Sequence, residues 1–283
     1  MGKKITSFYS KYKGVSDTAK KINRIWEKHI RKASKEIRKL YKCAPIKEER
    51  QEIIKDIHKQ GYKVFDLHIH TYISDGNESP QSVVDYAIDI GLDGIAITDH
   101  NAIRGGKLAQ QYIKEKGYDL LLFPAEEISS CEGHIVAYWV EFPEKKIKAG
   151  LSAVETCKKI HNMGGIAVAA HPFGPHGVSD PELLTTLFDA LEINSRSTAG
   201  SDSLAKDFAE AHKIAYTGGS DAHLIQSIGC GCTITKHPVK RTSDLYELII
   251  NHKTDVLITP MWVEILTYLE ELAEDYEEGL IQD

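Results

Sequence analysis

Asp66-Leu67-His68-Ile69-His70-Thr71, with Asp75-Gly76 close behind, is the stretch from which the rest of the sequence is best interpreted. Its apolar residues alternate with the aspartate and the two histidines, and this period of two is typical of a β-strand. On a strand, His68 and His70 point to the same face, one pleat apart. Two neutral imidazoles side by side can bind one divalent metal ion. A half-buried strand whose histidines face solvent gives the same pattern, so the remaining chain has to decide between the two interpretations.

The length and composition fit an α/β protein with a substantial core. With 283 residues, 42% of them hydrophobic, the chain can form one large domain or a domain with an appendage. The longest apolar runs have the length of a strand, so no transmembrane helix is expected, and the basic N-terminus lacks the apolar core of a secretory signal. The five cysteines form no Cys-x-x-Cys pair, which argues against a disulfide framework or a structural zinc site. Reduced thiols and a cytoplasmic location fit best.

Charge is divided unevenly along the chain. Residues 1–60 hold 18 Lys and Arg against 7 Asp and Glu, whereas residues 61–283 hold 17 against 34. A basic arm on an acidic body could attract nucleic acid or another polyanion. It could equally be a solvated helical face that packs on the acidic body, and we favour this second interpretation. Bound cations would also offset the excess of carboxylates in the body.

Residues 1–60 are predicted to form a basic N-terminal helical extension. From Ser16 to Leu40, apolar residues recur every three or four positions, which indicates one amphipathic helix. A second helix is predicted from Pro45 to Gln60, with Gly61 as its stop. We expect both helices to cover part of a barrel domain formed by residues 61–283.

From Tyr62 onward, short apolar strands alternate with helices. The predicted strands are 64–70, 95–98, 120–123, 135–139, 166–170, 190–194, 214–217, 233–235 and 256–258. The clearest predicted helices are 80–91, 151–162, 201–212 and 243–251, with an acidic helix over the tail 261–278. This alternation favours a parallel sheet covered by helices. About seven such units favour a closed barrel over an open sheet.

Ionisable residues stand where the predicted strands end. His68 and His70 end their strand, and a strand is followed by each of His100, Glu127, His171, Asp221 and His223. In barrels, the active site is built at that end of the strands. Taken singly, each residue has an ordinary explanation, such as a helix cap or a turn. Burying all of them together without cations would cost many kcal/mol, and nitrogen and oxygen ligands suit Zn²⁺, Mn²⁺ or Fe²⁺.

Five short motifs resemble those of the PHP (polymerase and histidinol phosphatase) family and follow in that family's order. They are Asp66–Thr71 with Ser74-Asp75-Gly76, Thr98-Asp99-His100-Asn101, Pro124–Ser129 with His134, Ala170-His171-Pro172, and Gly219-Ser220-Asp221-Ala222-His223. The resemblance implies a distorted (β/α)7 TIM-like barrel that holds two to three divalent metal ions.

The resemblance also implies a ligand set. The first metal would be bound by His68, His70, Glu127 and Asp221, the second by Asp75, His100 and His223, and the third by Glu127, His134 and His171. The family pattern selects Glu127 over Glu126, and Ala125 stands where the family usually has Gly. Histidinol-phosphatase-like members often carry His at the position of Asp75, whereas Asp is typical of members similar to nucleotide and oligonucleotide phosphoesterases.

The function that follows is a metal-dependent phosphoesterase, a phosphoric ester hydrolase in which a metal-bridging hydroxide attacks a nucleotide or a similar small phosphomonoester. Asp221 and His223 would serve catalysis as metal ligands. Arg196, just after the strand 190–194, is a candidate phosphate clamp, with a surface ion pair as its alternative. His176 is a candidate to contact the phosphate or protonate the leaving oxygen, with an exposed loop histidine as the alternative. Glu192 is expected to orient a ligand histidine.

Other functions stay open at this point. An exonuclease or other nucleic-acid-processing enzyme would use the basic N-terminal arm, although few aromatic residues accompany its charges. A histidinol-phosphatase-like enzyme and a degenerate barrel that serves as a scaffold are the further alternatives. A scaffold has no need for nine metal-binding side chains. The expected partner is a small phosphorylated substrate, such as a nucleotide or short oligonucleotide, without a membrane, and the sequence does not indicate an oligomeric state.

Overall fold

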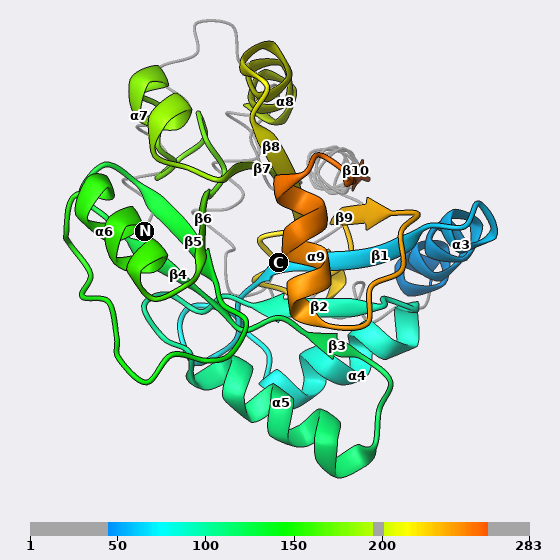
Figure 1. Ribbon diagram of the computed structural model, residues 1–283. Coiled ribbons are helices and arrows are strands. Elements are labelled where there is room, and N and C mark those ends of the chain that lie inside the picture. The colour runs from blue at the N-terminus through cyan, green and yellow to red at the C-terminus, as the bar shows by residue number, and fades with distance from the viewer. Residues whose placement is uncertain (1–44, 195–200, 260–283) are drawn as a thin grey trace, which may run out of the picture. The chain divides into compact units, whose positions relative to one another are not determined.

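The computed structural model describes residues 45–194 and 201–259 (Figure 1). One compact unit, residues 47–259, contains the sheets and the site. The helix expected from Ser16, the position of Arg196 and the expected tail helix lie outside the described residues. None of the described helices is long and apolar enough to cross a membrane.

The first of two five-stranded sheets has the order β10-β9-β1-β2-β3. Its central strand β1 (Lys63–Ile69) pairs in parallel with β2 (Gly94–Ile97) and antiparallel with β9 (Gly231–Thr235). The edges are β3 (Leu121–Leu122) and β10 (Asp255–Ile258). The central strand is thus the one that carries the two histidines of the opening motif.

The second sheet follows chain order, from β4 (Ala125–Ser129) and β5 (His134–Tyr138) through β6 (Ile166–Ala169) and β7 (Ala190–Asn194) to β8 (Ala215–Gly219). The strand β5 runs antiparallel to both of its neighbours, whereas β6, β7 and β8 are parallel. The expectation of parallel pairing throughout is therefore wrong. The connection between β4 and β5 is a tight turn, and so short a connection can join only antiparallel strands.

Strand–helix alternation predicted one closed barrel, but the described strands form two separate sheets. The sheets meet at two isolated bridges, Ile69 with Ala222 and His100 with Glu127. A continuous ladder cannot extend past these bridges because the chain leaves the extended conformation there. Asn101 has φ of 54° and Asp221 has φ of 52°, both in the left-handed region.

The described helices lie outside the strands or close one end of them. They are α3 (Pro45–Lys59), α4 (Pro80–Ile90), α5 (Arg104–Lys116), α6 (Ala153–Asn162), α7 (Pro181–Thr186), α8 (Ser201–His212) and α9 (Thr242–Ile250), with a short 3₁₀ helix η1 (Ile225–Ser227). Their ends follow local sequence. The hydroxyl of Ser79 caps α4, and Gly91 ends it in the left-handed conformation.

The helix α9 packs between the two sheets (Figure 1). Its cluster joins both sheets and contains Leu245, Tyr246 and Ile249 of α9 with Phe65, Leu67, Tyr138, Val168 and Ala190. The Tyr138 hydroxyl donates a hydrogen bond to the Leu67 carbonyl at 2.8 Å. Apolar packing thus holds the sheets together on one side of the site.

The strand β1 is irregular where it approaches the site. Its pairing register with β2 shifts between Asp66 and Ile69. Leu67 packs in the cluster between the sheets, whereas Ile69 packs against α4, so the apolar residues do not share one face as strict alternation predicted. Such bulges re-aim side chains next to functional sites.

Candidate metal centre

Nine polar side chains from separate segments meet beside the ends of β1, β2, β6 and β8 and the hairpin β4–β5. They are those of His68, His70, Asp75, His100, Glu127, His134, His171, Asp221 and His223. Both sheets contribute to this cluster. It falls into three overlapping groups, which we name the inner, outer and third groups.

The inner group consists of His68, His70, Glu127 and Asp221. Five separations among the two histidine Nε2 atoms, Oε2 of Glu127 and Oδ1 of Asp221 lie between 3.0 and 3.6 Å. A tetrahedron with edges of about 3.3 Å has its corners about 2.0 Å from its centre, which is the distance at which Zn²⁺ binds histidine nitrogen or carboxylate oxygen. These four donor atoms therefore have the spacing of ligands to a single ion.

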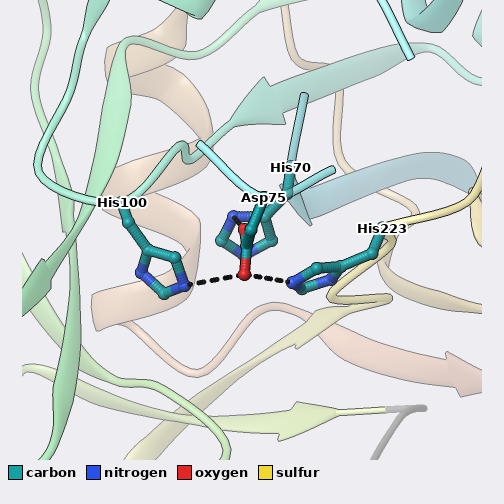
Figure 2. A group of neighbouring side chains, drawn as sticks. All are labelled: His70, Asp75, His100 and His223. Atoms are coloured by element: carbon teal, nitrogen blue, oxygen red, sulfur yellow. Dashed lines mark hydrogen bonds and ion pairs between the residues drawn. The ribbon is translucent and has the colours of Figure 1, made fainter. Parts of the chain in front are cut away.

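The outer group consists of His70, Asp75, His100 and His223 (Figure 2). Oδ2 of Asp75 lies 3.0 Å from Nε2 of His223 and 3.6 Å from Nε2 of His100. Oδ1 of Asp75 lies 3.4 Å from Nδ1 of His70. Figure 2 shows Asp75 between His100 and His223, with His70 behind it. The Asp75 side chain is 50% exposed, so this group forms the accessible side of the cluster.

The third group consists of Glu127, His134 and His171. Oε1 of Glu127 lies 3.0 Å from Nδ1 of His134 and 3.0 Å from Nε2 of His171. The other oxygen, Oε2, lies 3.1 Å from Nδ1 of His100. Glu127 thus stands at the centre of the cluster, with one oxygen toward the inner group and one toward the third. The neighbouring Glu126 makes no side-chain hydrogen bond to any described residue.

Several atoms of the cluster are buried without a hydrogen-bond partner among the described residues, namely Oε2 of Glu127 and Nδ1 of His100 and of His134. Buried polar atoms are nearly always paired, so atoms that lie near each other without bonding geometry require another explanation. Lone pairs that converge on a common point suit a cation held between them. The donor set therefore fits divalent metal ions.

The electrostatics of the cluster agree with that fit. Burial disfavours the charged form of His70, yet its close contacts with the carboxylates of Asp221 and Glu127 outweigh burial and raise its pKa to about 9. Burial also disfavours the Glu127 carboxylate, but the charge of His68 and the close contacts with His134 and His171 hold its pKa well below the ordinary value. Protons on these histidines thus compensate the carboxylates, a role that bound cations would take over.

Two ligand rings are oriented through their second nitrogen. Nδ1 of His68 hydrogen-bonds Oε1 of Glu192 at 2.8 Å, so the contact expected for Glu192 is present. Nδ1 of His223 hydrogen-bonds the carbonyl of Asp221 at 2.9 Å. Both acceptors require the proton on Nδ1, which leaves the lone pair of Nε2 facing the cluster.

Asp99 holds the loop that carries Asp75. Oδ1 of Asp99 accepts hydrogen bonds from the amide of Thr71 at 2.7 Å and from the hydroxyl of Ser74 at 2.8 Å. A Cβ on Gly76 would lie 2.4 Å from the carbonyl oxygen of His70, so the loop folds back on β1 more closely than a side chain permits. Sequence patterns alone assign no role to Asp99. Its only signal was an acidic residue between an apolar strand and a histidine.

His176 lies beside the third group. Its ring stacks on that of His134, with 5.5 Å between centroids, and its carbonyl accepts the amide hydrogen of His134 at 2.8 Å. The residue is exposed, and its φ of 61° is unusual for a side chain of this size. His176 is therefore held next to a candidate ligand.

The comparisons with known proteins point to one family. Residues 201–254 match a family model described as PHP-associated. The fold is similar to that of a two-domain protein from Bacteroides vulgatus that contains a predicted PHP-like metal-dependent phosphoesterase, with a TM-score of 0.55, 18% identity, and coverage of 71% of this chain and 66% of that one. Over 121 residues, the chain is 38% identical to the uncharacterized protein MJ1587 of Methanocaldococcus jannaschii, which covers 39% of this chain and 68% of that protein. This chain belongs to the PHP family.

The resemblance of the sequence motifs to the PHP family is thereby confirmed. A shorter match joins this PHP protein to the 5'-3' exoribonuclease Rnm of Salmonella typhimurium, with 38% identity over 77 residues, or 26% of each chain. Because that match spans about a quarter of the exoribonuclease, its activity bears on the PHP protein only as a proposal.

Proposed function

We propose that this chain is a metal-dependent phosphoesterase that hydrolyses the phosphate ester of a nucleotide or a similar small phosphomonoester. The observation that carries the proposal is the sharing of Glu127 between two of three adjoining groups of nitrogen and oxygen donors. Such an arrangement suits two to three divalent ions, Zn²⁺, Mn²⁺ or Fe²⁺, held side by side. Ions bound there would lower the pKa of a water molecule and offset negative charge on the phosphate.

The buried and the exposed residues of the cluster would have different roles. His68, His70 and Glu127 are fully buried and would fix the positions of the ions. Asp75, which is half exposed, lies on the side from which a phosphate can arrive. The site is thus rigid at its base and accessible at its rim, as positioning of a small substrate requires.

Two further residues would act on the substrate. His176 is proposed to contact the phosphate or to protonate the leaving oxygen, because it is exposed and stacked on His134. Arg196 is proposed to bind phosphate oxygens through its guanidinium. Replacement of His176 with Asn is expected to lower kcat while metal content stays unchanged.

The test is a substrate panel run with Mn²⁺, Zn²⁺ and Fe²⁺ in turn. The expected result is hydrolysis of one class of phosphomonoester, lost on chelation and restored by one of the three ions. Asp221→Ala should lose turnover and bound metal together. Full activity in the metal-depleted protein would reject the proposal, as would a chain that binds none of the ions.

A second candidate is hydrolysis of nucleic acid, which the Rnm match favours. The basic residues 1–60 would then bind phosphates, and affinity would fall steeply with added salt. Oligonucleotides in the same panel separate the two candidates. Turnover of oligonucleotides with strong salt dependence, and none of mononucleotides, would favour this second function. Histidinol phosphate belongs in the panel as the substrate of the remaining alternative.

A further inference from the structure

One carboxylate outside the ligand cluster touches two of its groups. Glu192 lies on β7 and is 1% exposed. Its Oε1 accepts the hydrogen bond from Nδ1 of His68, in the inner group, at 2.8 Å. Its Oε2 accepts one from the backbone amide of His171, in the third group, at 2.9 Å. A third hydrogen bond, from Nδ2 of Asn194 at 3.0 Å, fixes the carboxylate on its own strand.

The backbone of Gly219 packs closely against this contact. A Cβ on Gly219 would lie 2.2 Å from Oε1 of Glu192 and 2.6 Å from Cβ of His68. Any side chain at Gly219 would therefore push the carboxylate and the imidazole apart. Because His68 is completely buried, its ring has no solvent to replace a lost acceptor.

We propose that Glu192 is a positioning residue that couples the inner and third groups, so that its loss weakens metal binding in both. It keeps the proton of His68 on Nδ1, which leaves Nε2 free for an ion. Through the amide of His171 it also fixes the start of the loop that carries this second ligand. The inference rests on the proposed metal centre and adds, to the expected contact of Glu192 with one ligand histidine, a second contact that links it to another group.

Glu126 provides a matched control. It is also 1% exposed and lies on β4 of the same sheet, yet among the described residues it makes no hydrogen bond to a histidine. Glu126→Gln therefore tests the replacement of a buried carboxylate alone. Glu192→Gln makes the same chemical change, but its amide has a single acceptor oxygen and an NH2 donor, so it cannot accept from both Nδ1 of His68 and the amide of His171, and the displaced side chain disturbs both contacts.

The experiment is a competition titration of the full chain with Zn²⁺ against a chelating indicator. We expect two of the binding steps of Glu192→Gln to weaken by about 10- to 100-fold, as is typical when the hydrogen-bond partner of a ligand is removed. Glu126→Gln should bind within about twofold of the unchanged protein, since it touches no ligand. Circular dichroism of both variants serves as the control for folding.

Each outcome separates the coupling from the proposed function. If the unchanged protein binds no Zn²⁺, the metal centre itself is wrong. If it binds Zn²⁺ and Glu192→Gln binds equally well, Glu192 has no positioning role. Weakening of one step alone would overturn the coupling.

If Glu192→Gln does not fold, a measurement on the unchanged protein still tests the inference. The ¹⁵N spectrum of the zinc-loaded protein reports which nitrogen of His68 carries the proton. A proton on Nδ1 supports the inference, and a proton on Nε2 overturns it.

Discussion

At the scale of single residues, Glu127 is the side chain on which most of the cluster depends. Its two oxygens lie within 3.3 Å of nitrogens from five histidines, His68, His70, His100, His134 and His171. A carboxylate with so many neighbours is stable only if positive charge surrounds it. Its depressed pKa reflects that requirement.

Replacement of Glu127 with Gln should remove the ions of the inner and third groups, because the neutral amide offers one weaker oxygen. The outer group, which does not use Glu127, should keep its ion. Metal content measured by elemental analysis should fall to about one ion per chain. Unchanged metal content would show that Glu127 is not a ligand, and Glu126→Gln is the control.

Asp75→Asn is expected to have the opposite pattern. Asp75 belongs to the outer group alone and is half exposed, so the inner and third groups should keep their ions. Metal content, measured by elemental analysis, should fall by about one ion. Loss of every ion would contradict the separation of the groups.

Residue types were more predictable from the sequence than residue contacts. The structure brings together all nine side chains that the motifs indicated, and Glu127 rather than Glu126 faces them. Glu192 was expected to touch a histidine, but its second contact, to the amide of His171, depends on how β6 and β7 align. Neither that alignment nor the acceptor role of Asp99 can be inferred from spacing along the chain.

At the scale of elements, the loop between β1 and α4 shows how backbone shape positions a ligand. Gly76 approaches the carbonyl of His70, and Asp99 holds Thr71 and Ser74. Asp75 is therefore presented by a loop fixed on both sides. Its geometry depends on one glycine and one buried acceptor.

Gly76→Ala should displace this loop, since the added Cβ would overlap backbone atoms of β1. Overpacking of this kind costs about 1–3 kcal/mol, to be measured by denaturant unfolding, and the outer ion should be lost. Gly117→Ala is the control. Its positive φ costs about 1–2 kcal/mol, but the position is open and distant in sequence from every ligand, so metal content should be unchanged. Equal metal loss in both variants would refute the steric explanation.

The element that sequence patterns missed is β4. Consecutive glutamates interrupt its apolar pattern, and Glu is uncommon in strands, so Glu127 was expected after a strand rather than within one. The pairing of β4 with β5 overrides that local preference. The bulge in β1 was equally hidden, because it arises from pairing with β2.

At the scale of the whole unit, the inner and outer groups each draw ligands from both sheets, whereas the third group draws its ligands from the second sheet and its loops. His68, His70 and His100 belong to the first sheet or its loops, whereas Glu127, His134 and Asp221 belong to the second. In the described chain, the two isolated bridges, Ile69 with Ala222 and His100 with Glu127, pair the backbones of the two sheets directly. Ions bound in the cluster would therefore cross-link the sheets.

Removal of metal should thus lower the melting temperature and weaken the backbone hydrogen bonds at the two bridges between the sheets. Ligand linkage predicts about 2.7 kcal/mol of stabilisation per ion when its free concentration is 100 times Kd. Hydrogen exchange should increase on chelation at the amides of Glu127 and Ala222, which donate to the carbonyls of Thr98 and His68 between the sheets, more than at the amides that pair β5 with β6. Identical exchange with and without metal would show that the sheets hold together unaided.

The fold class was predictable because strand and helix patterns are local, whereas closure of the barrel is not. The number of strand–helix units, about seven, favoured a closed barrel. Whether neighbouring strands continue their ladder depends on backbone conformation at Asn101 and Asp221, where φ is positive. Two sheets joined by α9 and a polar cluster satisfy the same hydrophobic pattern.

The contrast in exposure between Asp75 and His68 has a practical consequence for anyone who purifies this protein. An ion held in part by a ligand half open to water would exchange within the time of an assay, whereas an ion held by the buried His68, His70 and Glu127 would exchange more slowly. The identity of the ion in the outer group would then depend on the assay buffer, and the identity of the ion in the inner group would depend on the medium in which the cells grew. Two preparations of identical sequence would differ in behaviour according to their history.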